Sequence, residues 1–138
     1  MGNYYQTTWR TYANFSLTGQ DLDPAEASSI FQIEPSDSFR AGDLRKNGTR
    51  WKHGHWSLES KDHLESDELS AHIEWLLDRL EPSQAYIASL QAANIRSRIF
   101  CYWELKSGSG GPSFTPALLS RLVVLNVELD IDFYCNCD

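Results

Sequence analysis

The chain has 138 residues, of which 41% are hydrophobic and 22% charged, as in an ordinary globular protein. This length suits a core that needs no disulfide or metal support, so we expect residues 1–138 to form a single domain. The net charge of −7 disfavours nucleic acid and anionic membranes as partners, and no apolar run is long enough to span a bilayer.

The first half of the chain predicts two strands and a short helix. Residues 9–18 alternate apolar and polar side chains, which is typical of a strand, and Gly19 ends the run. Asp23 and Pro24 then begin a helix that ends near Gln32, with Asp23 as its N-cap. Residues 35–55 follow no period and are expected to be irregular, whereas residues 56–59 predict a short strand.

Two helices are expected in the middle of the chain. Ser66 is the expected N-cap of the longest helix, and its apolar stripe repeats at helical spacing at Leu69, Ile73, Leu76 and Leu80. Pro82 ends this helix and begins a second one that runs to about Asn94.

The last third reads as strand, glycine loop, helix and strand. Residues 98–105 and 127–136 alternate strictly and predict two strands, the second with carboxylates along its outer face. Thr115 and Pro116 begin the helix between them, and Asn126 suits the left-handed residue that ends it.

These elements predict an α+β fold, a two-layer sandwich. Each end of the chain reads as a strand, a proline-started helix and a return strand, which suggests a duplication. We therefore expect a ferredoxin-like arrangement with a four-stranded sheet and the helical pair inserted between the two halves. Right-handed crossovers would place the two short helices on the same face of the sheet.

Several segments together resemble a known family, the bacterial Domain of Unknown Function family 4279. The resemblance covers about residues 12–134, and its segments are GQDLDP (19–24), IEP (33–35), WSL (56–58), HIEWLL (72–77), CYW (101–103), GGP (110–112) and LDID (129–132). It implies a small bacterial protein of the cytoplasm. It brings no established activity and no catalytic residues.

Three cysteines, Cys101, Cys135 and Cys137, do not make a disulfide framework. Their odd number, and the lack of a secretory signal pattern at the start, favour free thiols in a reducing cytoplasm. The strand alternation predicts that Cys101 and Cys135 point into the core.

A basic segment stands out in this acidic chain. Between Arg40 and Lys52 there are five basic residues and one acidic residue, a local charge of +4. With the nearby tryptophans it would form an anion-binding loop, in which Arg40, Arg45, Arg50, Trp51 and Trp56 are the candidate residues. The alternative is a solvated loop whose tryptophans pack on the sheet and whose charges pair with the acidic helices.

A second candidate surface is acidic. Glu128, Asp130 and Asp132, with Glu104 on a neighbouring strand, would recognise a basic partner protein. The same carboxylates would also suit a divalent cation or an acid–base pair, but neighbours on one strand face lie about 6.5–7 Å apart. A face kept soluble by its charge is the simpler explanation.

Neither a metal site nor a catalytic set is predicted. His53, His55 and His63 with Cys135 and Cys137 lack the usual spacing of zinc ligands. No nucleophile elbow or phosphate-binding loop occurs, and no cofactor is expected.

The sequence therefore favours a non-enzymatic cytoplasmic protein whose acidic surface recognises a protein partner. An immunity protein that neutralises a basic toxin is one concrete version, drawn from analogy. The alternative is a small-molecule or anion-binding protein that uses the basic, tryptophan-containing loop 39–56. A hydrolase or nuclease built on the strand carboxylates is the third hypothesis. The oligomeric state, a homodimer included, stays open.

Overall fold

The structure is a computed structural model and describes residues 8–105 and 108–135. Its elements in chain order are β1 (Thr8–Gly19), α1 (Pro24–Phe31), β2 (Asp37–Phe39), β3 (Gly54–Glu59), α2 (Leu69–Leu80), the 3-10 turn η1 (Glu81–Ser83), α3 (Gln84–Ala92), β4 (Arg96–Leu105), α4 (Pro116–Leu125) and β5 (Glu128–Cys135). The expected α+β class is confirmed, and two helices, α2 and α3, lie between β3 and β4 as expected.

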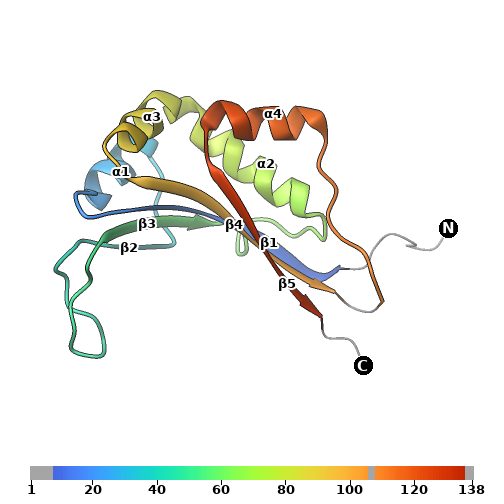
Figure 1. Ribbon diagram of the computed structural model, residues 1–138, viewed down its shortest axis with the longest axis horizontal. Helices are drawn as coiled ribbons and strands as arrows, with labels where there is room; N and C mark the ends of the chain where they lie inside the picture. Colours follow the sequence, from blue (N-terminus) through green and yellow to red (C-terminus); the bar gives the residue numbers. More distant parts are fainter. Residues whose placement is uncertain (1–7, 106–107, 136–138) are drawn as a thin grey trace.

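The described strands form one mixed sheet in the order β2-β3-β1-β4-β5. All the α-helices of the described residues lie on one face of this sheet, so the linking helices extend the same layer as the two short ones (Figure 1). The loop of residues 40–53, between β2 and β3, projects on the opposite side (Figure 1). We call this helix-free side the open face. It carries both candidate surfaces.

The four-stranded sheet with two matching halves is not confirmed. The sheet has five strands, because Asp37–Phe39 pairs with β3. The expected return strand of the first half, β3, runs antiparallel to β1, whereas β4 and β5 around α4 are parallel. A strand of three residues is too short to show a period, and the return direction depends on pairing between distant segments.

Most of the expected helix ends are confirmed by their hydrogen bonds. The Asp23 carboxylate accepts from the backbone N–H groups of Ala25 and Glu26, and Thr115 Oγ1 accepts from that of Leu118. Asn126 adopts the left-handed conformation, at φ 58°. The expected cap of α2 is wrong: the helix begins after Glu68, and Ser66 Oγ accepts from the Glu68 N–H instead.

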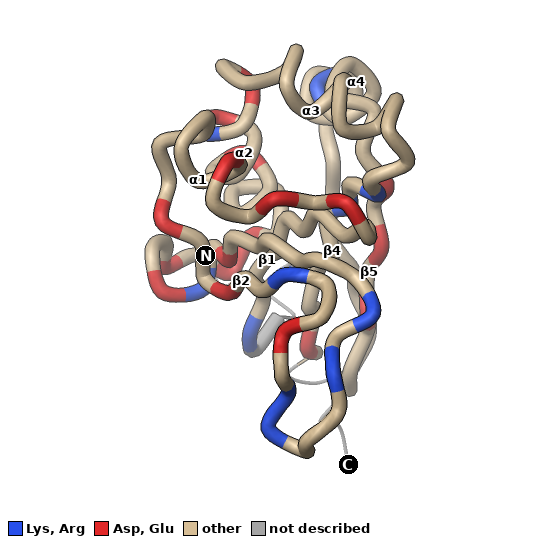
Figure 2. The backbone as a smooth tube through the Cα atoms, turned by 90° about the vertical axis from the view of Figure 1, so that its left-hand side faces the viewer, with Lys and Arg blue, Asp and Glu red and all other residues tan. Residues whose placement is uncertain are grey.

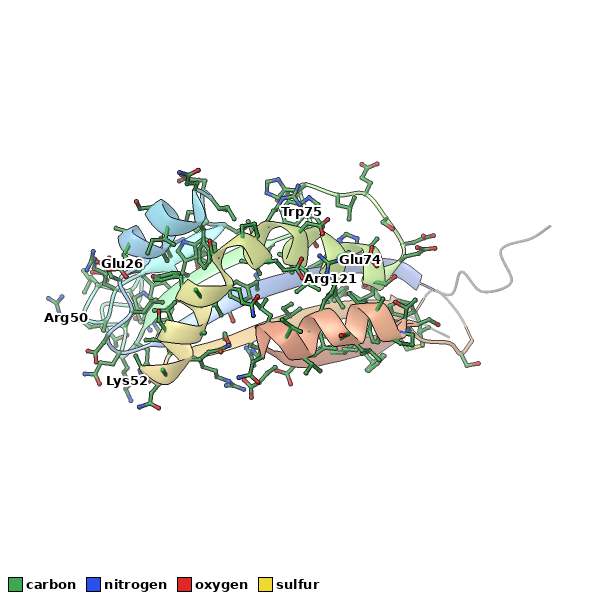
Figure 3. The ribbon with its side chains drawn as sticks, turned by 90° about the horizontal axis from the view of Figure 1, so that it is seen from above. Glu26, Arg50, Lys52, Glu74, Trp75 and Arg121 are labelled. Atoms are coloured by element: carbon green, nitrogen blue, oxygen red, sulfur yellow. The ribbon has the colours of Figure 1, made fainter. Side chains whose placement is uncertain are left out.

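The core lies between the helices and the sheet. Phe15 and Ile99 from the central strands pack there against helix residues such as Ile73 and Leu76, and all four side chains are fully buried. Arg121 ties α4 to α2, because its guanidinium lies 2.6 Å from Asp78 and 2.7 Å from Glu81 (Figure 3).

The thiol prediction is right at one position and wrong at another. Cys101 is a buried free thiol, and burial raises its pKa to about 12. Cys135 is exposed and disulfide-bonded, so neither its expected burial nor its expected free thiol is correct. Cys137 lies outside the described residues. Each helix in the described ranges is too short or too polar to cross a lipid bilayer.

Candidate functional site

The basic loop of residues 40–53 is held in a defined shape by its own backbone. Leu44 and Arg50 form an isolated antiparallel bridge, and the Arg45 N–H donates to the Thr49 carbonyl over 2.7 Å. At the tip, Asn47 Oδ1 accepts from the Thr49 N–H, and Gly48 takes φ +87°, which favours glycine. The loop is thus a short hairpin beyond the sheet.

Aromatic side chains pack this hairpin against the start of β3. Phe39 lies between Trp51 and His55, with ring centroids 3.7 Å and 5.0 Å away and near-parallel planes. The Arg45 guanidinium covers the Trp51 ring, 4.3 Å from its centroid. Since these groups cover one another's faces, the Phe39 and Trp51 rings have mainly their edges left for a ligand.

Beside this stack lies a cavity of about 700 Å³, open to solvent, which we call the loop pocket. Its lining combines three cations, two histidines, ring edges and a single carboxylate, from Thr18, Asp37, Phe39, Arg45, Thr49, Arg50, Trp51, Lys52, His53 and His55. The volume is in the range of pockets that hold small organic ligands.

The three cations of the loop pocket have no carboxylate partner among residues 8–105 and 108–135. Arg45 lies on Trp51, Arg50 donates through Nη1 to the Gly42 carbonyl at 2.8 Å, and no ion pair involves Lys52. Arg50 and Lys52 stand at one end of the molecule, away from Glu74 on α2 (Figure 3). The alternative in which these charges pair with the acidic helices is therefore wrong for this part of the chain.

His55 adds little charge to the loop pocket at neutral pH. Burial lowers the pKa of His55, and the nearby Asp37 opposes this only in part. The fixed positive charges that line the loop pocket are those of Arg45, Arg50 and Lys52.

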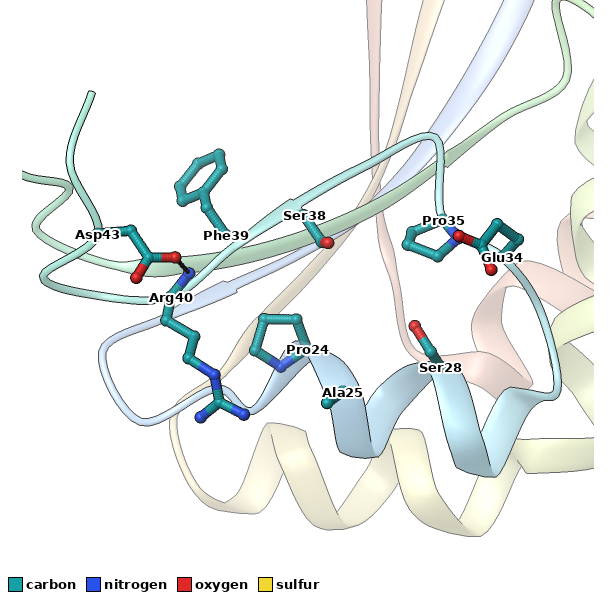
Figure 4. A pocket seen from close by; sticks show the side chains of 9 residues that line it. All are labelled: Pro24, Ala25, Ser28, Glu34, Pro35, Ser38, Phe39, Arg40 and Asp43. Carbon is teal, nitrogen blue, oxygen red and sulfur yellow. Dashed lines mark hydrogen bonds between the residues drawn. The ribbon is translucent and has the colours of Figure 1, made fainter. Parts of the chain in front are cut away.

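Arg40 belongs to a different hollow. Its guanidinium pairs with Asp23 at 2.7 Å, and its backbone N–H donates to the Asp43 carboxylate at 2.8 Å. It lines a second cavity of about 310 Å³ between α1 and β2, together with Glu34 and Asp43 (Figure 4). Because carboxylates offset its charge there, Arg40 is not placed with the other two candidate arginines.

Trp56 is not a binding residue. Its side chain is 0% exposed and packs against Phe15 and Phe31 on the helix side of the sheet. Its ring N–H donates to Ser28 Oγ at 3.0 Å. The alternation with Leu58 within one strand was the signal that both side chains face the core.

The acidic candidates lie together on the open face, but two of them are neutralised. Glu128 pairs with Arg96, and Asp130 pairs with Arg98 at 3.4 Å. The hydrogen bond from Arg96 holds the pKa of Glu128 below its usual value. The Asp132 carboxylate accepts from the Tyr134 hydroxyl at 3.3 Å and has no cationic partner among the described residues.

Glu104 differs from the other three carboxylates in being only 8% exposed. It accepts a hydrogen bond from the Tyr102 hydroxyl, and this bond is the main reason why the pKa of Tyr102 rises to about 12. In the described part of the chain no cation pairs with it. Asp132 and Glu104 therefore carry the negative charge that the arginines leave uncompensated.

Comparison with known families agrees with the resemblance in the sequence. The family model described as Domain of unknown function (DUF4279) matches residues 7–136, nearly the whole chain. The chain belongs to this family. No curated protein and no solved structure matches it. The DUF4279 description assigns no ligand or activity, and function is therefore inferred from the loop pocket and the open face.

The metal candidates of this DUF4279 chain are not brought together. Among the described residues no group of three or more His, Cys, Asp or Glu side chains is placed to hold a metal ion. His55 stacks on Phe39, whereas His63 stacks on Trp75 at the other side of the sheet layer. Cys137 lies outside the described residues.

Lys52, His53 and His55 are among the lining residues of the loop pocket that were missed as ligand-binding candidates. Their positions directly before and within β3 were a usable signal, because loop residues next to a strand end stay close to the sheet. Phe39 was noted in the sequence, but its stacking between Trp51 and His55 follows only from the pairing of β2 with β3.

Proposed function

We propose that this DUF4279 chain is a binding protein whose loop pocket takes a small organic anion. One observation supports this proposal above the others: Arg45, Arg50 and Lys52 surround a cavity and have no carboxylate partner among the described residues. Cations gathered around a cavity repel one another, so an anion placed between them would be stabilised.

The chemistry of the lining suggests the kind of anion. Guanidinium groups bind carboxylates and phosphates through paired N–H donors, and aromatic ring edges carry partial positive charge. The pocket also presents apolar surface from Phe39 and Trp51. A ligand with one phosphate or carboxylate group and an apolar body would use both parts of the lining.

Calorimetric titration tests this proposal with phenyl phosphate, benzoate and inorganic phosphate as probes. Phenyl phosphate should bind more tightly than inorganic phosphate, because it also covers apolar surface. Arg45→Gln should weaken phenyl phosphate binding at least about tenfold, the value of a charged hydrogen bond. Raising the salt concentration should weaken binding as well.

Lys46→Gln is the matched control. It removes the same charge from the neighbouring position of the same loop, but Lys46 does not line the loop pocket. We expect it to change the affinity by less than about twofold, as a screened surface charge does. Equal weakening by both variants, or no binding of any probe, would refute the pocket as an anion site.

The acidic-surface hypothesis and the cytoplasmic location stay predictions. Since Glu128 and Asp130 are paired with arginines and Glu104 is only 8% exposed, a basic partner would find its free carboxylate at Asp132.

A further inference from the structure

β5 leaves one edge of the sheet without a strand partner among the described residues. It pairs with β4 alone, in parallel, over residues 128–135. The backbone groups on its other side are therefore available to another extended chain. Its sequence, ELDIDFYC, contains neither proline nor lysine, the residues that commonly block an edge.

The two faces of this edge differ in chemistry. On the open face it carries Asp130, Asp132 and Tyr134, and on the helix side Ile131 and Phe133. Phe133 is 60% exposed, although it lies beside the buried Trp103 of β4 on the same side of the sheet. α4 lies on this helix side of the sheet (Figure 1) and exposes Leu119 and Val123. An incoming strand would meet carboxylates on one side and apolar surface on the other.

A row of stacked tyrosines crosses the open face and ends at this edge. Tyr12 stacks on Tyr102 at 5.0 Å between ring centroids, and Tyr102 stacks on Tyr134 at 4.9 Å. At the inner end, Arg10 and Lys61 lie 5.6 Å and 5.4 Å from the Tyr12 ring centroid. At the outer end, Tyr134 is 49% exposed and no described cation covers it. A cation beside Asp132 would cover the Tyr134 ring at the outer end, as Arg10 and Lys61 cover Tyr12 at the inner end.

A second copy of this chain fits the edge poorly. If Ile131 faced Ile131 of the other copy in an antiparallel pair, Asp130 would lie opposite Asp132 at both ends. A shift by two residues in either direction, the smallest that keeps the faces matched, places Asp130 against Asp130 or Asp132 against Asp132. Like charges directly opposite each other destabilise a strand pair, so charge favours a basic occupant over a second copy.

We propose that the β5 edge binds an extended segment of another protein in which basic and apolar residues alternate. The segment adds a strand to the sheet through backbone hydrogen bonds. Its basic side chains lie beside Asp132 and Tyr134, and its apolar side chains lie beside Ile131 and Phe133. This surface is separate from the loop pocket, so the two proposals stand or fall independently.

A synthetic peptide of alternating lysine and valine, long enough to pair with β5, tests the proposal. Fluorescence anisotropy measures its affinity, and hydrogen exchange of the backbone amides locates it. We expect binding together with slower exchange at residues 128–135. The same peptide with N-methyl groups on alternate residues should not bind, because it cannot form the ladder. A glutamate–valine peptide should not bind either.

Two charge reversals separate the edge from general attraction to an acidic protein. Asp132→Lys should weaken binding of the lysine–valine peptide about fivefold or more. Asp21→Lys makes the same change in net charge at an exposed residue of the β1–α1 loop and should have less than about a twofold effect. Tyr134→Ala should also weaken binding while the denaturation midpoint stays within the range of surface variants.

Three results would overturn the proposal. One is equal weakening by Asp132→Lys and Asp21→Lys. Another is peptide binding without a change in exchange at residues 128–135. The third is protection of these amides that grows with protein concentration alone, with dimers seen by sedimentation, since the occupant would then be a second copy.

Discussion

Trp56→Ala should cost about 3–5 kcal/mol of unfolding free energy, as truncation of a buried aromatic residue does. Its side chain is 0% exposed, lies 4.9 Å and 6.3 Å from the rings of Phe31 and Phe15, and donates to Ser28. The variant would leave a cavity at the centre of this cluster and an unpaired Ser28 hydroxyl.

Trp51→Ala provides the matched comparison, because it deletes the same side chain from the loop. We expect an unfolding free energy within about 1 kcal/mol of the parent, since Trp51 packs on the loop and outside the core cluster. Its binding of phenyl phosphate should weaken, because the stack that positions Arg45 is lost. Urea denaturation followed by circular dichroism measures both variants. Equal loss of stability in the two would contradict the positions described for these tryptophans.

A buried network of hydrogen bonds should give the second large loss of stability when it is broken. Ser60 and His72 are 0% and 1% exposed, and Ser60 Oγ lies 2.6 Å from His72 Nδ1. His72 Nε2 lies 2.9 Å from the Ser66 carbonyl, which only accepts, so Nε2 carries the proton and Nδ1 accepts from Ser60. Ser60 Oγ in turn accepts from the Ala13 N–H at 3.0 Å. This hydrogen-bond network thus links β1, the loop after β3 and α2.

Ser60→Ala should destabilise the protein by about 2–4 kcal/mol, because it leaves the Ala13 N–H and His72 Nδ1 buried without partners. Ser29→Ala is the control: Ser29 is exposed on α1, and we expect a change within about 0.5 kcal/mol. Denaturation midpoints measure both. A midpoint of Ser60→Ala equal to that of the control would show that this hydrogen-bond network contributes nothing to stability.

The same histidine predicts how stability depends on pH. Burial lowers the pKa of His72 in the folded protein, so the unfolded chain binds the proton more readily. Stability should therefore be full above about pH 6.5 and decline as the pH falls toward the folded pKa, by at most about 1.4 kcal/mol per pH unit for each such histidine. His55, whose pKa is also lowered by burial, acts in the same direction.

Unfolding free energies measured from pH 7.5 to 5 check this dependence. His72→Gln, compared with the parent, should reduce the slope by about one proton where the two curves differ most. His63→Gln, which removes an exposed imidazole, is the control for the loss of a histidine. An unchanged slope in His72→Gln would mean that His72 is not the group that titrates.

Local patterns in the sequence were sufficient to predict most of the helices and strands. Strict alternation located β1, β4 and β5, and the residue pairs Asp23-Pro24 and Thr115-Pro116 located the starts of α1 and α4. These signals succeed because a strand or helix period and an N-cap depend on residues close together in the chain. Family membership was also visible, since its segments are short and contiguous.

The candidate site was predictable only in part, because its geometry also depends on residues that are far apart in the chain. The charge of the basic loop was visible in the sequence, and Arg45, Arg50 and Trp51 do line one cavity. Arg40 and Trp56 do not join them, because Arg40 pairs with a residue 17 positions earlier and Trp56 faces the helix side of its strand.

Pairing between distant segments decided the rest. The antiparallel return of β3 beside β1 gives a mixed sheet in place of two matching halves, and β2 exists only through its contact with β3. The parallel pairing of β4 with β5 sets Arg96 and Arg98 against Glu128 and Asp130 and leaves Asp132 uncompensated at the edge. Such partners are about thirty residues apart in the chain, and no local period reports which segments pair or in which register.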